Sequence, residues 1–287
     1  MSYTENLPRS FGKEYDNNVI FQHLKIIQDF YTSLSICNIS FIENAAFVSD
    51  SKVFSTSTYI YGSIEGTLES ISILLHNGRC NDAFALVRKY SDSVILDIYR
   101  NILSKQIDKD FHKKLTFDSI KNNKIKQWID AENHLFEERD TAKIYRAIAT
   151  EFPELTKMFN LTDKSTLYHK LRNICNDNMH YNYFYTMMAN DVNLINCRKD
   201  MWMPLLKNMD KAIRLFFIIH FSFIYVGNPI YLMASDYIDY LDCGMQPPTG
   251  CERWIPNKVQ IAFSSIVKNY APKISKYLLS LDLMDLE

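Results

Sequence analysis

Glycine is scarce in this chain. It occurs seven times in 287 residues, whereas about 20 glycines are expected at this length, because glycine makes up about 7% of residues on average. All-β folds and glycine-rich phosphate-binding loops both depend on glycine for tight turns and positive φ angles. The patterns GxGxxG and GxxxxGKS/T are also missing from the sequence. Rossmann and P-loop nucleotide-binding folds are therefore not expected.

Paired cysteines and long apolar runs are lacking as well. The six cysteines are Cys37, Cys80, Cys175, Cys197, Cys243 and Cys251, and the sequence contains no CxxC pair. Neither a zinc cluster nor a disulfide framework is expected. The most apolar stretch, Leu215 to Val226, covers about twelve residues, too few to cross a bilayer, and predicts a buried helix. The segment from Met1 to Gly12 is polar, so we expect no signal peptide, a cytoplasmic location and no membrane contact.

The chain also lacks a large excess of either charge. Its 32 basic and 33 acidic residues give a formal net charge of −1, so no overall field attracts nucleic acid or anionic lipid. Basic residues do cluster between residues 100 and 126, where eight Lys or Arg occur with three Asp. This cluster predicts a local RNA-binding surface formed by Lys113, Lys114, Lys121, Lys124 and Lys126. A solvated helix face and loop is the alternative.

Apolar residues recur at three- and four-residue intervals along most of the chain, which predicts helices. Asn77-Gly78 is expected to end one of them, because glycine accepts the left-handed conformation after a helix C-terminus. Pro272 is expected to interrupt the last helix. The predicted helices cover about 14–37, 59–76, from 81 or 82 to 105, 118–136, 139–149, from 163 or 165 to 188, 203–226, 230–240 and 257–283.

The fold class expected from this pattern is all-α. We predict an N-terminal helical extension over residues 1–58, a helical bundle over 59–226, and C-terminal helices packed on the bundle over 227–287. One single helical domain is the simpler alternative, because the sequence shows neither an internal repeat nor a low-complexity linker.

A dense group of polar residues occupies 168–183, with the sequence YHKLRNICNDNMHYNY. On a helix, Arg172, Asn176 and His180 rise along one side, and Asn173 has nearly the same azimuth as His180. Histidine exchanges a proton near neutral pH, and the arginine fork holds phosphate oxygens. The amides could position a ribose or a phosphate. The pattern indicates metal-free phosphodiester chemistry, and a polar helix face with His180 bonded to a carbonyl is the alternative.

Arg88 and Asp92 form a second candidate group. They are four residues apart on a helix and can pair. The same side of this helix carries the apolar residues Phe84, Ile95 and Tyr99. A buried charge needs a partner, so the pair either satisfies itself within the helix or faces a second polar helix, such as the one with Arg172 and His180.

A third and weaker group is acidic. Asp236, Asp239, Asp242 and Glu252 flank a loop rich in proline and glycine. A divalent metal would need several of these carboxylates to converge, and the sequence gives no sign of convergence, so no metal site is predicted.

Two segments resemble known sequence motifs. Residues 68–99 contain the pattern A..L.R...D at Ala83, Leu86, Arg88 and Asp92, which resembles the front helical hairpin of bacterial HEPN-like domains. The segment LRNICNDNMHYNY resembles the second motif of that family, an arginine followed by a polar residue and later by a histidine. The resemblance covers about residues 59–226. It implies a bundle of four or more helices that commonly dimerises, so that two motifs face one cleft.

The resemblance also implies a function. Many members are metal-independent endoribonucleases of toxin–antitoxin, abortive-infection or CRISPR-associated defence systems. By analogy, His180 would act as general base or acid, Arg172 would stabilise the transition state, and Asn173 would orient Arg172 or the phosphate. Supporting residues would be Arg88, Asp92, Asn176, Tyr181 and Tyr183, of which the tyrosines could stack on bases. The products would end in a cyclic phosphate, and no cofactor would be needed.

One departure and one alternative accompany this resemblance. The family places four to six residues between its arginine and histidine, whereas seven separate Arg172 from His180; a helix end or a π-bulge would absorb the difference.

The expected partners are RNA and a protein. The protein would be a second copy of the chain, an antitoxin or a defence-complex subunit. The alternative function is a catalytically inactive helical module that binds a protein or a nucleotide as a subunit of a larger complex.

Overall fold

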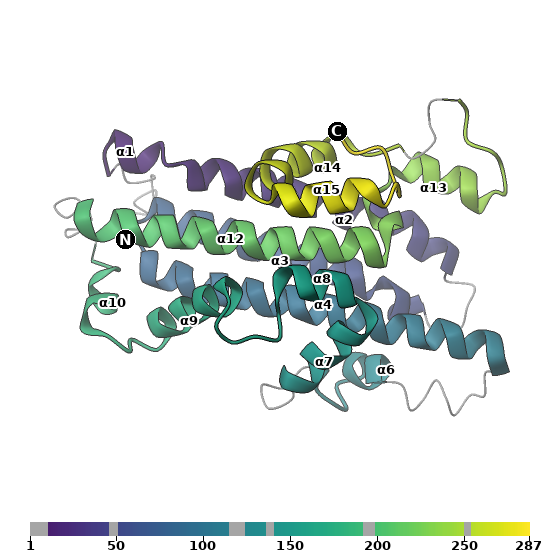
Figure 1. Ribbon diagram of the computed structural model, residues 1–287, viewed down its shortest axis with the longest axis horizontal. Coiled ribbons are helices and arrows are strands. Elements are labelled where there is room, and N and C mark those ends of the chain that lie inside the picture. The colour runs from purple at the N-terminus through teal and green to yellow at the C-terminus, as the bar shows by residue number, and fades with distance from the viewer. Residues whose placement is uncertain (1–10, 46–50, 115–123, 136–140, 192–198, 250–253) are drawn as a thin grey trace, which may run out of the picture.

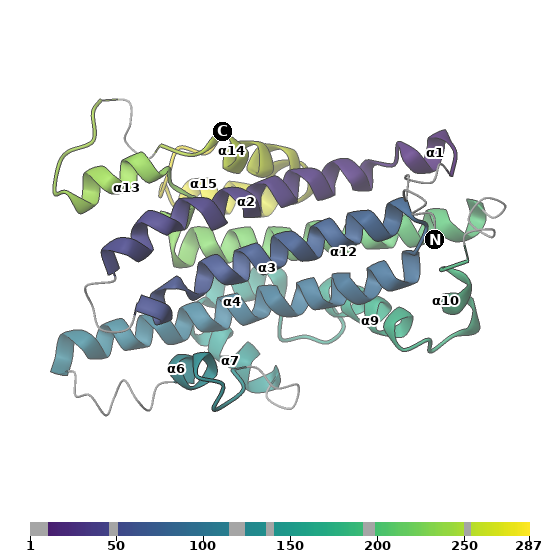
Figure 2. The same cartoon turned by 180° about the vertical axis from the view of Figure 1, so that it is seen from behind.

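The computed structural model describes residues 11–45, 51–114, 124–135, 141–191, 199–249 and 254–287. Within these ranges the chain forms helices and loops and no β-strand, so the all-α class predicted from the sequence is confirmed. Four long helices form the centre of the fold (Figures 1 and 2). They are α2 (Val19–Ala45), α3 (Ser51–His76), α4 (Cys80–Lys114) and α12 (Lys199–Gly227). Helix α2 packs on α3, α3 on α4, and α12 on both α4 and α2.

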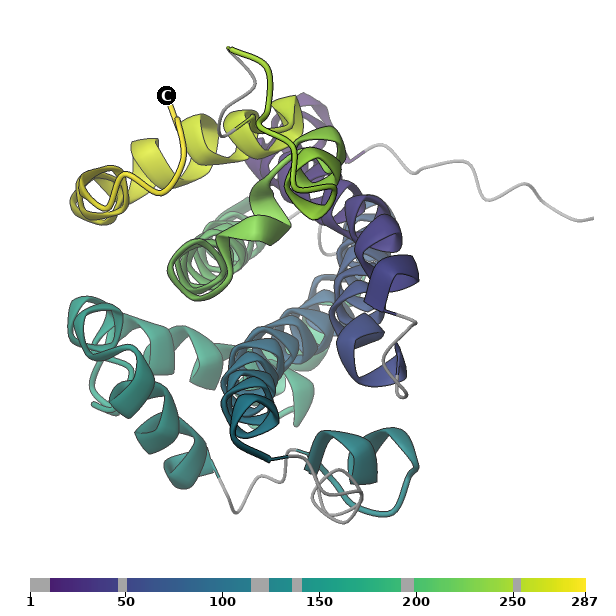
Figure 3. The same ribbon diagram turned by 90° about the vertical axis from the view of Figure 1, so that its right-hand side faces the viewer.

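Shorter helices cover two sides of this bundle, as the end view in Figure 3 shows. On α2 and α12 lie α14 (Asn257–Ala262), the π-helical η3 (Phe263–Lys268) and α15 (Pro272–Ser280). Around α4 lie α6 (Lys124–Ile129), α7 (Thr141–Glu151) and α9 (Leu167–Met179), while α8 (Pro153–Phe159) joins α7 to α12. The remaining elements are α1 (Lys13–Asp16), α10 (Phe184–Met188), η2 (Pro229–Leu232) and α13 (Ser235–Asp242).

The predicted apolar stripes form the core. Buried residues of α2 include Leu24, Ile27, Phe30, Tyr31 and Leu34, and those of α3 include Ile64, Leu68, Ile71 and Leu75. Residues 216–225 of α12 are all buried, as expected for the most apolar stretch of the sequence. Most of the buried apolar side chains form one cluster that reaches from Phe11 to Leu286. It includes residues from all three predicted segments, and α3 runs across the expected boundary between residues 58 and 59.

Two helix ends follow from local chemistry. Gly78 has a φ of 69°, and its N–H donates to the carbonyl of Leu75 while the N–H of Arg79 donates to that of Leu74. The predicted glycine stop is therefore confirmed. The single helix predicted over 14–37 is wrong, because α1 ends at Asp16 and α2 begins at Val19. The Asn18 carboxamide oxygen accepts the N–H of Ile20 at 3.1 Å, which caps the new helix.

Other predicted helices are divided or displaced in the described chain. The helix expected to continue to residue 136 ends at Ile129, and Ala131 has a φ of 57°, which a helix cannot continue through. The expected helix over 230–240 is divided into η2 and α13. The last helix is interrupted at Pro272 as predicted, since this proline stands at the first turn of α15, where no backbone N–H is needed.

Candidate functional site

A pocket of about 570 Å³ lies between α4 and α9. Helix α4 contributes Ala85, Arg88, Lys89, Asp92, Ser93 and Leu96, and the end of α9 contributes Arg172, Asn176, Met179 and His180. The lining thus includes three cationic side chains and one carboxylate. It brings together five of the residues singled out in the sequence: Arg88, Asp92, Arg172, Asn176 and His180. The surplus of positive charge makes the pocket attractive to an anion.

Asp92 is the point on which the two arginines converge. Arg88 pairs with Asp92 along α4, and its Nε donates to the Oδ1 of Asn176 across the helix interface at 2.7 Å. Arg172 Nη2 donates to Asp92 Oδ1 at 3.3 Å. The arginine side chains are 8% and 12% exposed, whereas that of Asp92 is 34% exposed. The carboxylate therefore stands between the guanidinium groups and solvent.

Arg172 retains one unused donor within the described part of the chain. Its Nε is buried and has no hydrogen-bond partner there. A buried donor without a partner costs about 1–3 kcal/mol. An incoming acceptor, such as a phosphate oxygen, would recover this energy.

Behind the pocket the side chains are protonated and unreactive. Tyr145 Oη and Tyr168 Oη are 2.9 Å apart, and burial raises the pKa of both phenols. Burial also raises the pKa of Cys175 to about 12. This cysteine is therefore a thiol at neutral pH and not a nucleophile.

His180 marks the end of α9. Its backbone N–H donates to the carbonyl of Asn176 at 3.0 Å, and the next residue, Tyr181, has a φ of 50°. The continuous helix predicted to reach residue 188 is therefore wrong: α9 ends at Met179 and α10 begins at Phe184. His180 lines the same pocket as Arg172, as expected for positions eight apart along one side of a helix. The His180 residue is exposed.

Three other predicted site residues lie outside the pocket lining. Asn173 is exposed on α9. Tyr181 and Tyr183 are 49% and 52% exposed and follow the end of the helix. Tyr183 stacks on Tyr185, with ring centroids 5.5 Å apart and an interplanar angle of 11°.

The lysines predicted to bind RNA do not line the pocket, and one of them falls outside the described chain. Lys113 and Lys114 belong to the last turn of α4, and Lys124 and Lys126 to α6. At a rise of 1.5 Å per residue, Lys113 lies roughly 30 Å along α4 from Asp92. Lys121 is not among the described residues. In the pocket itself, Lys89 is the lysine of the lining.

The acidic group predicted near the proline- and glycine-rich loop can be followed only in part, because Glu252 lies outside the described ranges. Among the residues that are described, no three His, Cys, Asp or Glu side chains gather closely enough to hold a metal ion. In the same ranges no helix is long and apolar enough to span a membrane.

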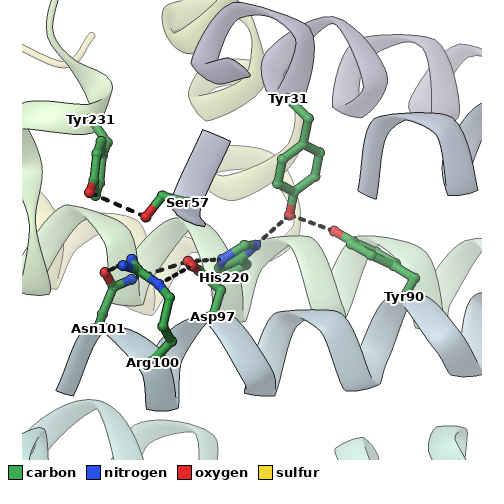
Figure 4. A network of polar contacts seen from close by, with 8 residues as sticks. All are labelled: Tyr31, Ser57, Tyr90, Asp97, Arg100, Asn101, His220 and Tyr231. Atoms are coloured by element: carbon green, nitrogen blue, oxygen red, sulfur yellow. Dashed lines mark hydrogen bonds and ion pairs between the residues drawn. The ribbon is translucent and has the colours of Figure 1, made fainter. Parts of the chain in front are cut away.

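A buried polar network at the centre of the bundle was missed by sequence reasoning (Figure 4). His220 Nε2 lies 3.0 Å from Asp97 Oδ2, and His220 Nδ1 lies 2.7 Å from Tyr31 Oη. Arg100 Nε donates to Asp97 Oδ1 at 3.3 Å. Asp97 and His220 are 0% exposed and Arg100 is 1% exposed. Without solvent access this network connects α2, α4 and α12 rather than forming a reaction site.

The proton positions in this network follow from the charge of Asp97. Burial disfavours the carboxylate, but the hydrogen bond from His220 and the positive charge of Arg100 outweigh it and lower the pKa of Asp97. A carboxylate only accepts, so His220 Nε2 donates to Asp97, and in the neutral imidazole Nδ1 accepts from Tyr31. The signal in the sequence was a histidine inside the most apolar helix, which requires a polar partner on another helix.

Comparison with family models, curated proteins and solved structures finds no match for this chain.

Proposed function

We propose that the chain is a metal-independent endoribonuclease of the HEPN-like kind and that the pocket between α4 and α9 is its active site. The observation that carries the proposal is that one pocket is lined by a histidine, two arginines and an amide: His180, Arg88, Arg172 and Asn176. Such groups can supply the proton transfer and the charge stabilisation that phosphodiester cleavage without a metal needs. The catalytic role of Asn173 has less support, because this residue does not line the pocket.

The reaction would be an internal transfer of the phosphodiester. His180 takes the proton of the ribose 2′-hydroxyl, the 2′ oxygen bonds to phosphorus, and the bond from phosphorus to the 5′ oxygen breaks. The leaving oxygen receives a proton from water or from the histidine of a second copy. The product carries a 2′,3′-cyclic phosphate. The arginines stabilise the charge that builds up on the phosphate oxygens.

Asp92 would act as the internal competitor of the substrate. It holds Arg172 through a contact of 3.3 Å, while Arg88 pairs with it along α4. A phosphate that enters the pocket can take over Arg172 and offers an acceptor to its unused Nε. Arg88 would stay oriented by Asn176. The two arginines therefore differ in role: Arg172 exchanges partners, and Arg88 fixes the cleft.

The test is cleavage of a single-stranded RNA in excess EDTA. The wild-type protein is expected to give products with cyclic-phosphate ends. His180→Ala is expected to lower the rate by roughly 100-fold or more, the usual contribution of a general base. Arg172→Lys keeps the charge but loses the planar fork, and we expect a loss of similar size.

The controls separate chemistry from folding. His180 is exposed, so His180→Ala should alter the free energy of unfolding by less than about 0.5 kcal/mol. His134 is another exposed histidine outside the pocket, and His134→Ala should cleave like the wild type. Cleavage that survives both His180→Ala and Arg172→Lys would reject this site.

A second function is favoured by an exposed apolar segment that follows the pocket. Tyr183, Phe184, Tyr185 and Met187 are 52%, 74%, 52% and 47% exposed, which is unusual for large apolar side chains in sequence. In the inactive-module alternative this segment would dock a partner protein. If no RNA is cleaved, this alternative leads, and the first partners to test are a second copy of the chain and the product of a neighbouring gene. A role in anti-phage defence or in a toxin–antitoxin pair belongs to the ribonuclease proposal.

A further inference from the structure

A second polar cluster lies where the C-terminal helices cover α2 and α12. Tyr270, between η3 and α15, has its hydroxyl 3.1 Å from Nε2 of His23 in α2. His23 Nδ1 lies 2.6 Å from Asp210 Oδ1 in α12. His23 and Asp210 are each 5% exposed, whereas Tyr270 is 45% exposed. Three residues from three parts of the sequence thus form a chain of hydrogen bonds that ends at a partly exposed tyrosine.

The direction of the hydrogen bonds follows from the charge of Asp210. Burial disfavours its ionisation, but hydrogen bonds from His23 and Arg214 outweigh burial and lower the pKa of this carboxyl group. Asp210 is therefore a carboxylate and can only accept hydrogen bonds. His23 must donate from Nδ1, and in the neutral imidazole Nε2 is then an acceptor. The hydroxyl of Tyr270 donates to it.

Arg214 completes the cluster from two sides. Its Nε and Nη2 donate to Asp210 Oδ2 at 2.9 and 2.6 Å, and its Cζ lies 3.7 Å from the centroid of the Tyr270 ring. A cation over an aromatic ring is attracted to the negative charge of its face. This attraction grows when the phenol loses its proton, because the charge of a phenolate spreads into the ring.

We propose that Tyr270 is a nucleophile that accepts an acyl group from an activated ester, with His23 as the base. A nucleophile within hydrogen-bond reach of a base that a third group orients is the usual arrangement for covalent catalysis. The phenol oxygen bonds to the carbonyl carbon, and the bond from that carbon to the leaving oxygen breaks. The proton passes from Tyr270 through His23 to the leaving group. The products are an aryl ester on Tyr270 and a free alcohol.

The chemistry of Arg214 selects the acyl donor over a phosphoryl donor. Two of its nitrogens already bind Asp210, and its Cζ lies over the Tyr270 ring, so its fork is not presented to an incoming phosphate. The carboxylate of Asp210 would also repel an anion. An uncharged ester does not depend on the Arg214 fork and is not repelled by the Asp210 carboxylate.

The test uses p-nitrophenyl acetate and the intact chain, with acetylated peptides identified by mass spectrometry. Tyr181 serves as the internal control, because it is 49% exposed and, among the described residues, no hydrogen bond or ring contact joins its side chain to a histidine. General-base assistance is worth roughly 100-fold or more, so Tyr270 should be acetylated at least 100-fold faster than Tyr181. Hydroxylamine should remove the acetyl group, since it cleaves aryl esters and leaves acetylated lysines intact.

Two variants complete the test. Tyr270→Phe keeps the ring beneath Arg214 and removes the nucleophile, so the fast nitrophenolate burst should disappear. His23→Gln should slow acetylation of Tyr270 about 100-fold and leave Tyr181 unchanged. Equal acetylation of Tyr270 and Tyr181 in the wild type would overturn the proposal without reference to any variant. Tyr270 lies outside the pocket lining, so Tyr270→Phe should cleave RNA like the wild type, and the two proposals fail independently.

Discussion

Asp97 and Asp92 show how differently two carboxylates of one helix can behave. Both belong to α4, but Asp97 is 0% exposed and bonded to His220 and Arg100, whereas Asp92 is partly exposed beside the pocket. Movement of Asp97 would break its contacts with the buried Arg100 and His220, which costs free energy, so its position is fixed. Asp92 can release Arg172 to an incoming anion with solvent nearby.

Replacement of Asp97 is expected to destabilise the fold strongly. Asp97→Ala removes the buried carboxylate that Arg100 and His220 share, and removal of one member of a buried pair costs about 3–5 kcal/mol. Chemical denaturation with urea at pH 7 measures the loss. Asp239→Ala, at an exposed carboxylate of α13, is the matched control and should cost less than about 0.5 kcal/mol. A loss below 1 kcal/mol for Asp97→Ala, on the order of ordinary surface changes, would show that the network adds little stability.

Sequence reasoning found some of these residues and missed others for a physical reason. Arg88 and Asp92 interrupt the apolar surface of α4 four residues apart, which left open a pair within the helix or a partner helix. Both contacts are present, because Arg88 pairs with Asp92 and α9 contacts them through Arg172 and Asn176. His220 and Asp97 are 123 positions apart, and His23 and Asp210 are 187 apart. Helical periodicity places residues only within one helix, so it cannot pair positions that tertiary packing brings together.

The bounds of a helix were predictable where its apolar stripe is continuous and less so where apolar residues become sparse. The stripe of α4 was expected to end near Lys105, but the helix continues to Lys114 through a mainly polar sequence in which Ile107 and Phe111 alone keep the apolar spacing. At the end of α9 the opposite happened. The apolar pattern continues past Met179, but Tyr181 adopts a positive φ and the helix stops. His180, the residue just before Tyr181, lines the pocket.

Alanine substitutions at two glycines of the α3–α4 hairpin are expected to change the free energy of unfolding in opposite directions. Gly78 has a φ of 69°, and an alanine there is strained, so Gly78→Ala should destabilise by about 1–2 kcal/mol. Gly62 lies within α3, and a Cβ there meets nothing within 4 Å. Gly62→Ala should therefore stabilise by about 1 kcal/mol through helix propensity. Thermal unfolding of both variants measures the difference, and two shifts of the same sign would be inconsistent with this account of the turn.

Two carboxylates are buried in the described part of the chain, Asp97 and Asp210, and each contacts a histidine of a neighbouring helix. Asp97 connects α4 to α12, and Asp210 connects α12 to α2. Both have a pKa below the usual 3.8 of aspartate, because hydrogen bonds and cationic partners outweigh the effect of burial. Ion pairs at two levels of one bundle thus contribute to the same unfolding transition.

Acid should therefore unfold the protein through these groups. The folded state binds fewer protons than the unfolded state, so their stabilisation is complete above about pH 4 and is lost as the pH falls through the lowered pKa values. Each group contributes a slope of up to about 1.4 kcal/mol per pH unit in that window. Urea unfolding between pH 7 and pH 2 is the measurement.

Two variants test whether Asp97 and Asp210 cause the fall in the free energy of unfolding at acid pH. Asp97→Asn and Asp210→Asn are each less stable at pH 7, but each removes one titrating carboxylate, so the free energy of unfolding should fall less steeply below pH 4 than in the wild type. The two effects should add, because the groups contact different partners. Curves that run parallel to the wild type across the acid range would mean that other groups control acid unfolding, and the buried carboxylates would then stabilise the fold equally at every pH.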